Sequence, residues 1–255
     1  MTGALPPRDR LVILTSLAGV ALLAWWYVIG MAADMAMPMG GGMPMVELRP
    51  WTAGYFIMML TMWAVMMVGM MVPSVAPTVL IYAGVARKAA REGAAVASAY
   101  GFVAGYLVIW IGVSLLATLA QWQLDQWALL SPMLVSKSPA FGAAVLVGAG
   151  VYQQLPIKQQ CLKHCRGPIQ FIAEHWKSGA AGAFRMGLEH GIFCVGCCWM
   201  LMLLLFVGGV MNLLWIAAIT IFILLEKVMP LGEAGGRCVG LLMVAAGGIM
   251  AVLGV

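Results

Sequence analysis

A histidine and three cysteines lie in residues 185–202, RMGLEHGIFCVGCCWMLM, where a charged segment passes into a long apolar run. At about 100° per residue, His190, Cys194 and Cys197 lie on one narrow stripe of a helix, with Cys198 on its flank. Imidazole and thiolate groups are ligands that soft metal ions prefer. The stripe therefore predicts a metal site, in which Glu189 would orient the ring of His190. The alternative is that the cysteines only pack as small apolar side chains.

A second group of the same residue types precedes this stripe in the sequence CLKHCRGP. Cys161, His164 and Cys165 share one helical face at positions i, i+3 and i+4. Neither spacing matches a zinc-finger signature. The two groups together predict one soft-metal site, with copper as the first choice and zinc or another soft metal as alternatives. His175, in EHW, is expected to be an ordinary residue at the membrane surface.

Methionines extend the set of soft ligands. A glycine- and proline-broken segment, residues 31–50, holds closely spaced methionines, and a long apolar run carries another four at helical spacing (Met37, Met39, Met43 and Met45; then Met59, Met62, Met66 and Met70). Thioethers are neutral and bind Cu(I) without losing a proton. The first group predicts metal capture, with a flexible loop as the alternative. For the second group core packing is the first interpretation, since methionine in a helix is an ordinary gap-filler, and a path for the metal ion is the alternative.

The elements that must position these residues are transmembrane helices. The chain is 64% hydrophobic and 9% charged, with a mean hydropathy of +1.00, and its apolar runs are long enough to cross a bilayer. Helices that satisfy their own backbone groups are the expected structure there. We predict a single all-α integral membrane domain over residues 1–255, with about seven spans (11–30, 51–86, 94–120, 141–155, 192–210, 212–230 and 238–255). Pro73 and Pro77 are expected to tilt, kink or break the second span.

The positive charges predict the orientation of this bundle. With the N-terminus in the cytoplasm, only Arg49 and Lys137 of the 14 Lys and Arg residues lie outside, as the positive-inside rule requires. This places residues 31–50 outside and the polar segment 156–189, with an interfacial helix from Pro168, on the cytoplasmic side. The net charge of +5 is thereby explained without nucleic-acid binding. We predict a multi-pass protein of the bacterial inner membrane. Signal-peptidase cleavage near MAADM, which would remove the first span, stays open.

Other reaction centres are not evident in the sequence. No glycine run is followed by the Lys-Ser/Thr of a phosphate-binding loop, and no serine lies in a nucleophile elbow. Glu226 lies near the inner end of the sixth predicted span, beside Lys227. A carboxylate within the membrane predicts a partner or a role in proton handling. The alternative is that both side chains snorkel to the nearby interface.

Several motifs resemble those of a known family: WAVMMVGMMVPSVAPTVLIYA, CLKHCRGP, FRMGLEHGIFCVGCCWMLM and NLLW…LLEKVMP. They are similar to those of a widespread bacterial family of uncharacterised, predicted metal-binding integral membrane proteins with a CxGCCW core, here Cys194–Trp199. The resemblance covers most of the chain from Trp51 to about Pro230. It implies metal binding through these cysteines and histidines, without an assigned reaction.

The sequence therefore predicts a protein that binds a soft metal, with copper favoured by the ligand chemistry, and handles or transports the ion across the inner membrane. Thioether ligands outside and thiolates inside favour inward movement. Two alternatives stay open, namely a membrane-bound metal-dependent oxidoreductase that uses the same cluster and an assembly or structural subunit of a membrane complex. The expected partners are the lipid bilayer, the metal ion, and a metallochaperone or membrane-complex partner.

Overall fold

The computed structural model describes residues 5–36, 51–95, 98–127, 129, 134–136, 138–229 and 232–254. Their regular secondary structure is α-helical, which confirms the predicted class. The helices are α1 (Pro7–Ala36), α2 (Ala53–Arg91), α3 (Ala99–Gln126), α4 (Pro139–Gln154), α5 (Pro156–Arg166), α6 (Pro168–His175), α7 (Gly179–Leu203), α8 (Leu205–Gly208), α9 (Leu213–Val228) and α10 (Gly232–Leu253).

Local sequence signals begin these helices. The side chains of four residues accept a hydrogen bond from a backbone N–H in the first turn of α2, α3, α4 and α9, as N-caps do (Thr52, Ser98, Ser138 and Asn212). Proline occupies the first turn of α4, α5 and α6, where its missing N–H costs no hydrogen bond. Helix starts are therefore encoded locally, by caps and prolines.

Among the described residues, five stretches are long and apolar enough to cross a membrane: α1, α2, α3, α7 together with α8, and α10. A sixth span results if α4 and α5, which meet at a 66° bend, are taken together. The spans predicted at 141–155 and 212–230 correspond to α4 and α9, which have 16 residues each. Helices of that length extend about 24 Å, which is less than the roughly 30 Å of a hydrocarbon core.

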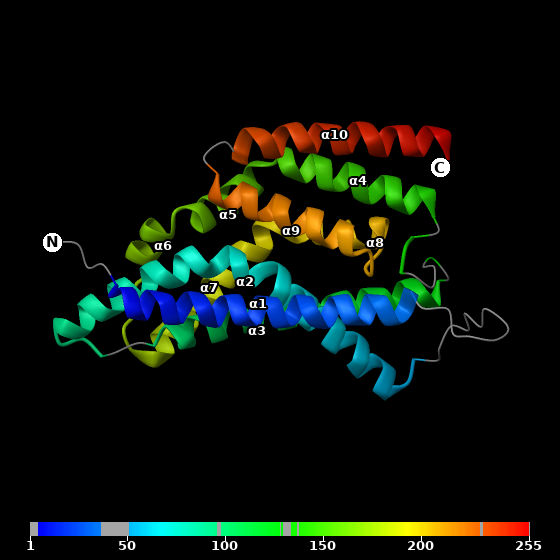
Figure 1. Ribbon diagram of the computed structural model, residues 1–255. Coiled ribbons are helices and arrows are strands. Elements are labelled where there is room, and N and C mark those ends of the chain that lie inside the picture. The colour runs from blue at the N-terminus through cyan, green and yellow to red at the C-terminus, as the bar shows by residue number, and fades with distance from the viewer. Residues whose placement is uncertain are drawn as a thin grey trace.

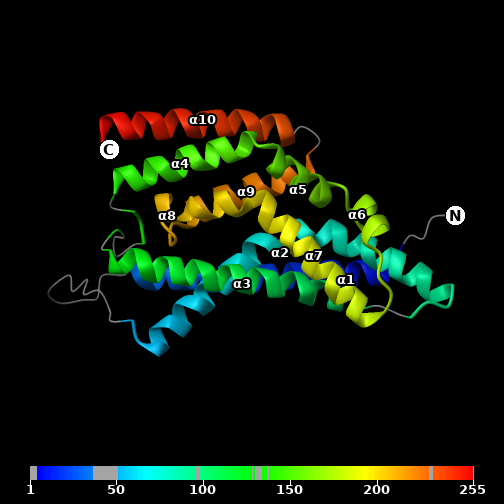
Figure 2. The ribbon, with the colours of Figure 1, turned by 180° about the vertical axis from the view of Figure 1, so that it is seen from behind.

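The helices pack as neighbouring pairs (Figures 1 and 2). Helix α4 lies along α10, α3 along α7, and α2 between α1 and α3, while α9 contacts both α2 and α10. The largest fully buried side chains include Trp63 and Tyr82 of α2 and Tyr106 and Trp110 of α3. The core that positions the candidate site is therefore formed mainly by α2, α3 and α7.

Helix α2 continues without interruption through Pro73 and Pro77 over 39 residues. Of the predicted alternatives at these prolines, a break does not occur, and a tilt or a kink of the continuous helix stays a prediction. Each proline still removes one backbone hydrogen bond from the helix. The carbonyl of Met71, in the turn before Pro73, accepts hydrogen bonds from Tyr106 Oη at 3.3 Å and from Ser74 Oγ at 2.9 Å. Polar side chains therefore gather at this part of α2.

Helices α3 and α7 approach each other so closely that only glycine fits at the crossing. A Cβ atom on Gly105 would lie 2.0 Å from the carbonyl oxygen of Phe184, and one on Gly187 would lie 2.0 Å from that of Phe102. Gly101 and Gly105 lie four residues apart on α3, a spacing of small residues that lets helices in a membrane approach closely. This crossing fixes the rotation of α7 and therefore the direction of its cysteines.

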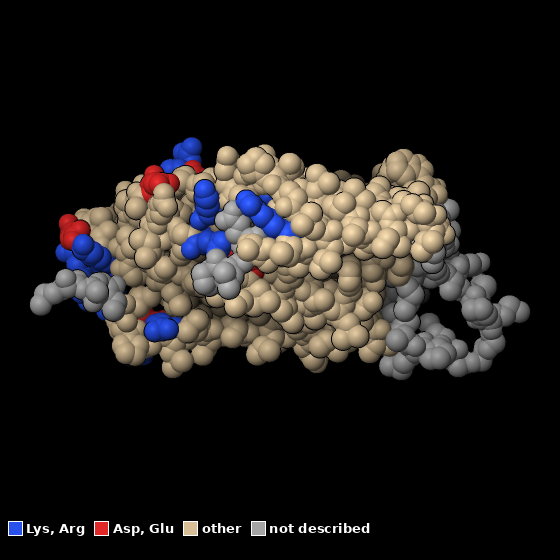
Figure 3. All heavy atoms as spheres, turned by 90° about the horizontal axis from the view of Figure 1, so that it is seen from above, with Lys and Arg blue, Asp and Glu red and all other residues tan. Residues whose placement is uncertain are grey.

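Charged side chains gather at one end of the molecule (Figure 3). In this view Lys, Arg, Asp and Glu lie toward the end where Figure 1 shows α5 and α6, and the other end shows no charged residue apart from atoms that are not described. The N-terminus lies at the charged end and the C-terminus at the opposite end (Figure 1). The apolar surface between them is that of a membrane protein.

Candidate metal centre

The methionine stripe of α2 faces the protein interior. Met59, Met62, Met66 and Met70 are all at least 95% buried. At the end of the stripe near the start of α2, Gln121 of α3 donates to Met59 Sδ at 3.4 Å and accepts from Trp63 Nε1 at 2.8 Å. The predicted path residues Met37, Met39, Met43 and Met45 lie outside the described residues. The four methionines of α2 thus form a buried row of thioethers.

The cysteines of α7 are buried beside this core. Cys194, Cys197 and Cys198 are each at most 2% exposed, and the thiols of Cys197 and Cys198 both donate to the carbonyl oxygen of Cys194 at 3.0 Å. Cys165 of α5 brings its Sγ to 4.0 Å from Cys197 Sγ. Two sulfurs on opposite sides of one ion lie roughly 4.6 Å apart, given metal–sulfur bonds of about 2.3 Å. Cys165 and Cys197 are therefore spaced to share one ion.

Cys194 is held by a lysine from a distant helix. Lys227 of α9 is 7% exposed, and its Nζ donates to Cys194 Sγ at 2.9 Å and to Ser74 Oγ at 3.1 Å. Tyr106 Oη lies 3.1 Å from the same sulfur. An ammonium group has only donors, so the sulfur accepts from Lys227 as a thiolate would. A buried ammonium requires an anion beside it, and Cys194 is placed to be that anion.

Glu226, the neighbour of Lys227, pairs with a different lysine. Lys158 of α5 and Glu226 are 1% and 4% exposed, with Nζ and Oε1 2.5 Å apart. Gln153 accepts a second hydrogen bond from the same Lys158 ammonium. Neither Glu226 nor Lys227 reaches solvent, so the snorkelling alternative does not describe them. Helices α4, α5, α7 and α9 are thereby joined through three buried polar contacts, Lys158 with Gln153, Lys158 with Glu226, and Lys227 with Cys194.

The predicted histidines lie apart from the thiols. His190 is 2% exposed, and its Nδ1 has no hydrogen-bond partner. His164 stacks on Phe193, with ring centroids 4.0 Å apart, whereas Cys161 faces α7, where a Cβ on Gly196 would lie 2.7 Å from its Sγ. Glu189 binds Lys177 and Arg185 rather than His190. Among the described residues, no three His, Cys, Asp or Glu side chains are arranged to hold one metal ion together.

Several residues of this site are not evident from the sequence. Lys158 and Lys227 read as topology-determining cations, Tyr106 lies in none of the motifs, and Ser74 lies within WAVMMVGMMVPSVAPTVLIYA without a role of its own. The one signal for Lys227 is a lysine that ends an apolar run directly after a glutamate. The thiols that are present suit a soft ion such as Cu(I), which binds few soft ligands.

A comparison with protein families gives one match. The family model described as "PpoB2: Copper chaperone" matches residues 60–250, a range that includes all six cysteines and all three histidines. No curated protein and no solved structure matches the chain.

Proposed function

The chain belongs to the PpoB2 family of copper chaperones, and from this premise we propose that it carries Cu(I) through the bacterial inner membrane by means of its buried sulfur ligands. The thiols at the inner end of the α2 methionine stripe are the observation that carries the proposal. Ser74 of α2 binds Lys227, and Lys227 binds Cys194. The row of thioethers therefore ends where the thiols begin.

The order of the ligands supports inward movement. The methionine stripe begins near the start of α2, at the end where Figure 3 shows no Lys, Arg, Asp or Glu among the described residues of the face in view, and the cysteines lie nearer to the charged end. Thiolates bind Cu(I) more strongly than neutral thioethers do. An ion that enters along Met59, Met62, Met66 and Met70 is therefore transferred to stronger ligands. Residues 31–50 would capture it outside.

The ammonium of Lys227 supplies a positive charge beside Cys194, and a bound copper ion would take its place. Before copper binds, the ammonium neutralises Cys194 inside the bundle at a distance of 2.9 Å. After copper binds, a second cation at the same sulfur would repel the ammonium. Lys227 therefore has to move away from Cys194, which links loading of the site to a displacement of α9 or of the Lys227 side chain.

The proposal is tested by comparing two cysteines. Cys197→Ser is expected to weaken Cu(I) binding roughly tenfold or more, since it removes one of few ligands. The matched control is Cys238→Ser, because Cys238 is exposed on α10. Cu(I) titration of the purified proteins against a chromophoric chelator measures the difference. Equal affinities in both variants would mean that the α7 thiols are packing groups.

The proposed topology has seven crossings and a cytoplasmic N-terminus. Termini at opposite ends (Figure 1) fit an odd number of crossings, and the charged end then faces the cytoplasm. A reporter enzyme active only outside is expected to be active when fused at Gly41 and inactive when fused at Gly179. Activity on the same side at both positions would contradict this topology.

A further inference from the structure

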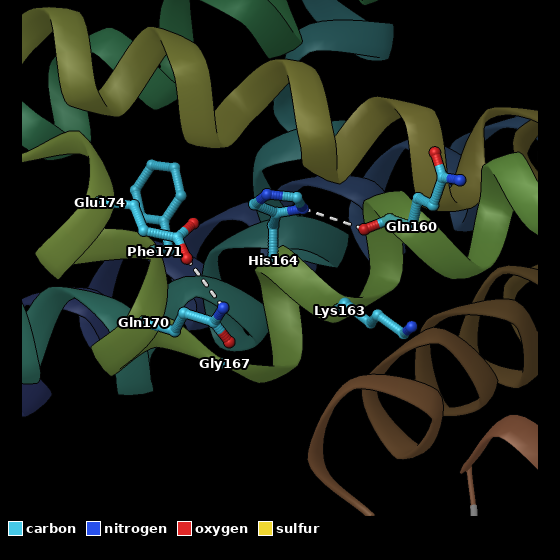
Figure 4. A pocket seen from close by; sticks show the side chains of 7 residues that line it. All are labelled: Gln160, Lys163, His164, Gly167, Gln170, Phe171 and Glu174. Atoms are coloured by element: carbon cyan, nitrogen blue, oxygen red, sulfur yellow. Dashed lines mark hydrogen bonds between the residues drawn. The ribbon is translucent and has the colours of Figure 1, made fainter.

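A pocket of about 320 Å³ opens between α5 and α6 at the charged end of the molecule (Figure 4). Its lining is mostly polar and includes Lys163, His164, Glu174 and two glutamines, with Phe171 as the apolar wall. The neighbouring side chains include His175, whose ring stacks on Phe171 with centroids 4.8 Å apart. One half-buried histidine, His164, therefore lines this opening, and a second, His175, stacks on Phe171, which is one of its walls.

Both histidines are held in the tautomer that a metal ligand needs. Nδ1 of His164 lies 2.9 Å from the carbonyl oxygen of Gln160, and Nδ1 of His175 lies 3.1 Å from that of Phe171. A carbonyl oxygen only accepts, so each Nδ1 carries a proton, and in the neutral form of the ring Nε2 has the free lone pair. Metal-ligating histidines commonly bind a backbone carbonyl in this way. In Figure 4 the other ring nitrogen of His164 points away from Gln160, toward the side of Phe171 and Glu174.

The two rings are spaced for a shared ion. Their centroids lie 6.1 Å apart, with the ring planes at 76°. Two imidazoles that hold one ion between them have centroids roughly 6 Å apart, given metal–nitrogen bonds of about 2 Å. Two neutral nitrogen ligands suit Cu(I), and no proton has to be released from them. The spacing of the two rings is therefore compatible with one Cu(I) ion held by a nitrogen from each of them.

A third histidine connects this pair to the thiols. The ring centroid of His190 lies 5.0 Å from that of Phe171, the ring on which His175 stacks. Its Nδ1 is buried and has no hydrogen-bond partner. Such an atom lowers the stability of the fold unless a ligand binds to it. His190 lies one helical turn before Cys194 on α7. It is therefore the intermediate group between the thiols and the pocket.

We propose that His164 and His175 form a second Cu(I) site, open to the pocket, at which the ion exchanges with ligands from the aqueous phase. The inference rests on the proposed function and deepens it, because it names the point where copper passes between the protein and solution. His190 passes the ion between this site and Cys194.

The test uses the full chain in detergent micelles and anaerobic Cu(I) titration against a chromophoric chelator. Wild-type protein is expected to bind two classes of ion, one at the thiols and one at the imidazoles. His175→Ala and His164→Ala are expected to weaken the second class roughly tenfold or more and to leave the first unchanged. Gln170→Ala, at the lining of the same pocket, is the matched control. Retention of both classes in the histidine variants, or loss of both together, would overturn the inference.

Two further measurements separate this inference from the function on which it rests. In Cys197→Ser, X-ray absorption of the remaining Cu(I) is expected to show nitrogen neighbours, and sulfur neighbours alone would overturn the inference. If Cys197→Ser changes nothing while His175→Ala removes one class, the thiol route fails and the histidine site stands. In wild-type protein, Cu(I) is expected to slow the reaction of His164 and His175 with diethyl pyrocarbonate about tenfold. Unchanged rates at saturating copper would overturn the inference without any variant.

Discussion

Replacing Lys158 with methionine is expected to lower the free energy of unfolding by about 3–5 kcal/mol, because Glu226 would then be a buried charge without its partner. The pair is 1% and 4% exposed, and its atoms are 2.5 Å apart. Gln153 binds the same ammonium and cannot supply a charge. Equilibrium unfolding in mixed micelles measures the change.

Two further variants test whether the loss of stability in Lys158→Met comes from the unpaired charge of Glu226. Lys163→Met lies on the same helix at an exposed position and is expected to change the unfolding free energy by less than about 0.5 kcal/mol. The double variant Lys158→Met with Glu226→Leu is expected to recover most of the loss, since no unpaired charge remains. If the double variant also binds Cu(I) normally, Glu226 is a structural group rather than a proton carrier. Equal stability of Lys158→Met and Lys163→Met would contradict the buried pair.

Replacing Cys194 with alanine is expected to destabilise the copper-free protein by about 3–5 kcal/mol, although the substitution removes only one sulfur atom. The reason is Lys227, which would lose the group that lies 2.9 Å from its Nζ and keep the hydroxyl of Ser74 as its hydrogen-bond partner. Adding Lys227→Met to Cys194→Ala is expected to restore most of the stability. If the double variant has the same unfolding free energy as Cys194→Ala alone, Lys227 and Cys194 do not form an ion pair.

The same pair predicts how many protons copper releases. A thiol must lose its proton when it binds a metal, but a Cys194 thiolate already paired with Lys227 has none to lose. Lys227→Met is therefore expected to release about one more proton per bound Cu(I) than wild-type protein does. Cu(I) titration in weak buffer with a pH indicator measures the number. Equal release from both proteins would mean that Cys194 is a neutral thiol beside Lys227.

The sequence by itself determined the class of the protein and the residue types of the site. Hydrophobicity and helical periodicity are local properties, so the chain's apolar runs predict membrane helices. Periodicity also predicts that Met59, Met62, Met66 and Met70 share one face, and the structure places that face in the core. Gly105 likewise lies at a close helix contact, but its position in the sequence does not identify the helix that it contacts.

Only the tertiary structure decided which of these faces meet. Lys227 and Cys194 are 33 residues apart in the chain, and Lys158 and Glu226 are 68 apart. Spacing within one helix does not determine the helix opposite it, because that depends on how each helix is rotated and crossed in the bundle. For the same reason Cys165 faces the thiols of α7, whereas His164, the next residue in the chain, turns to Phe193 and His175.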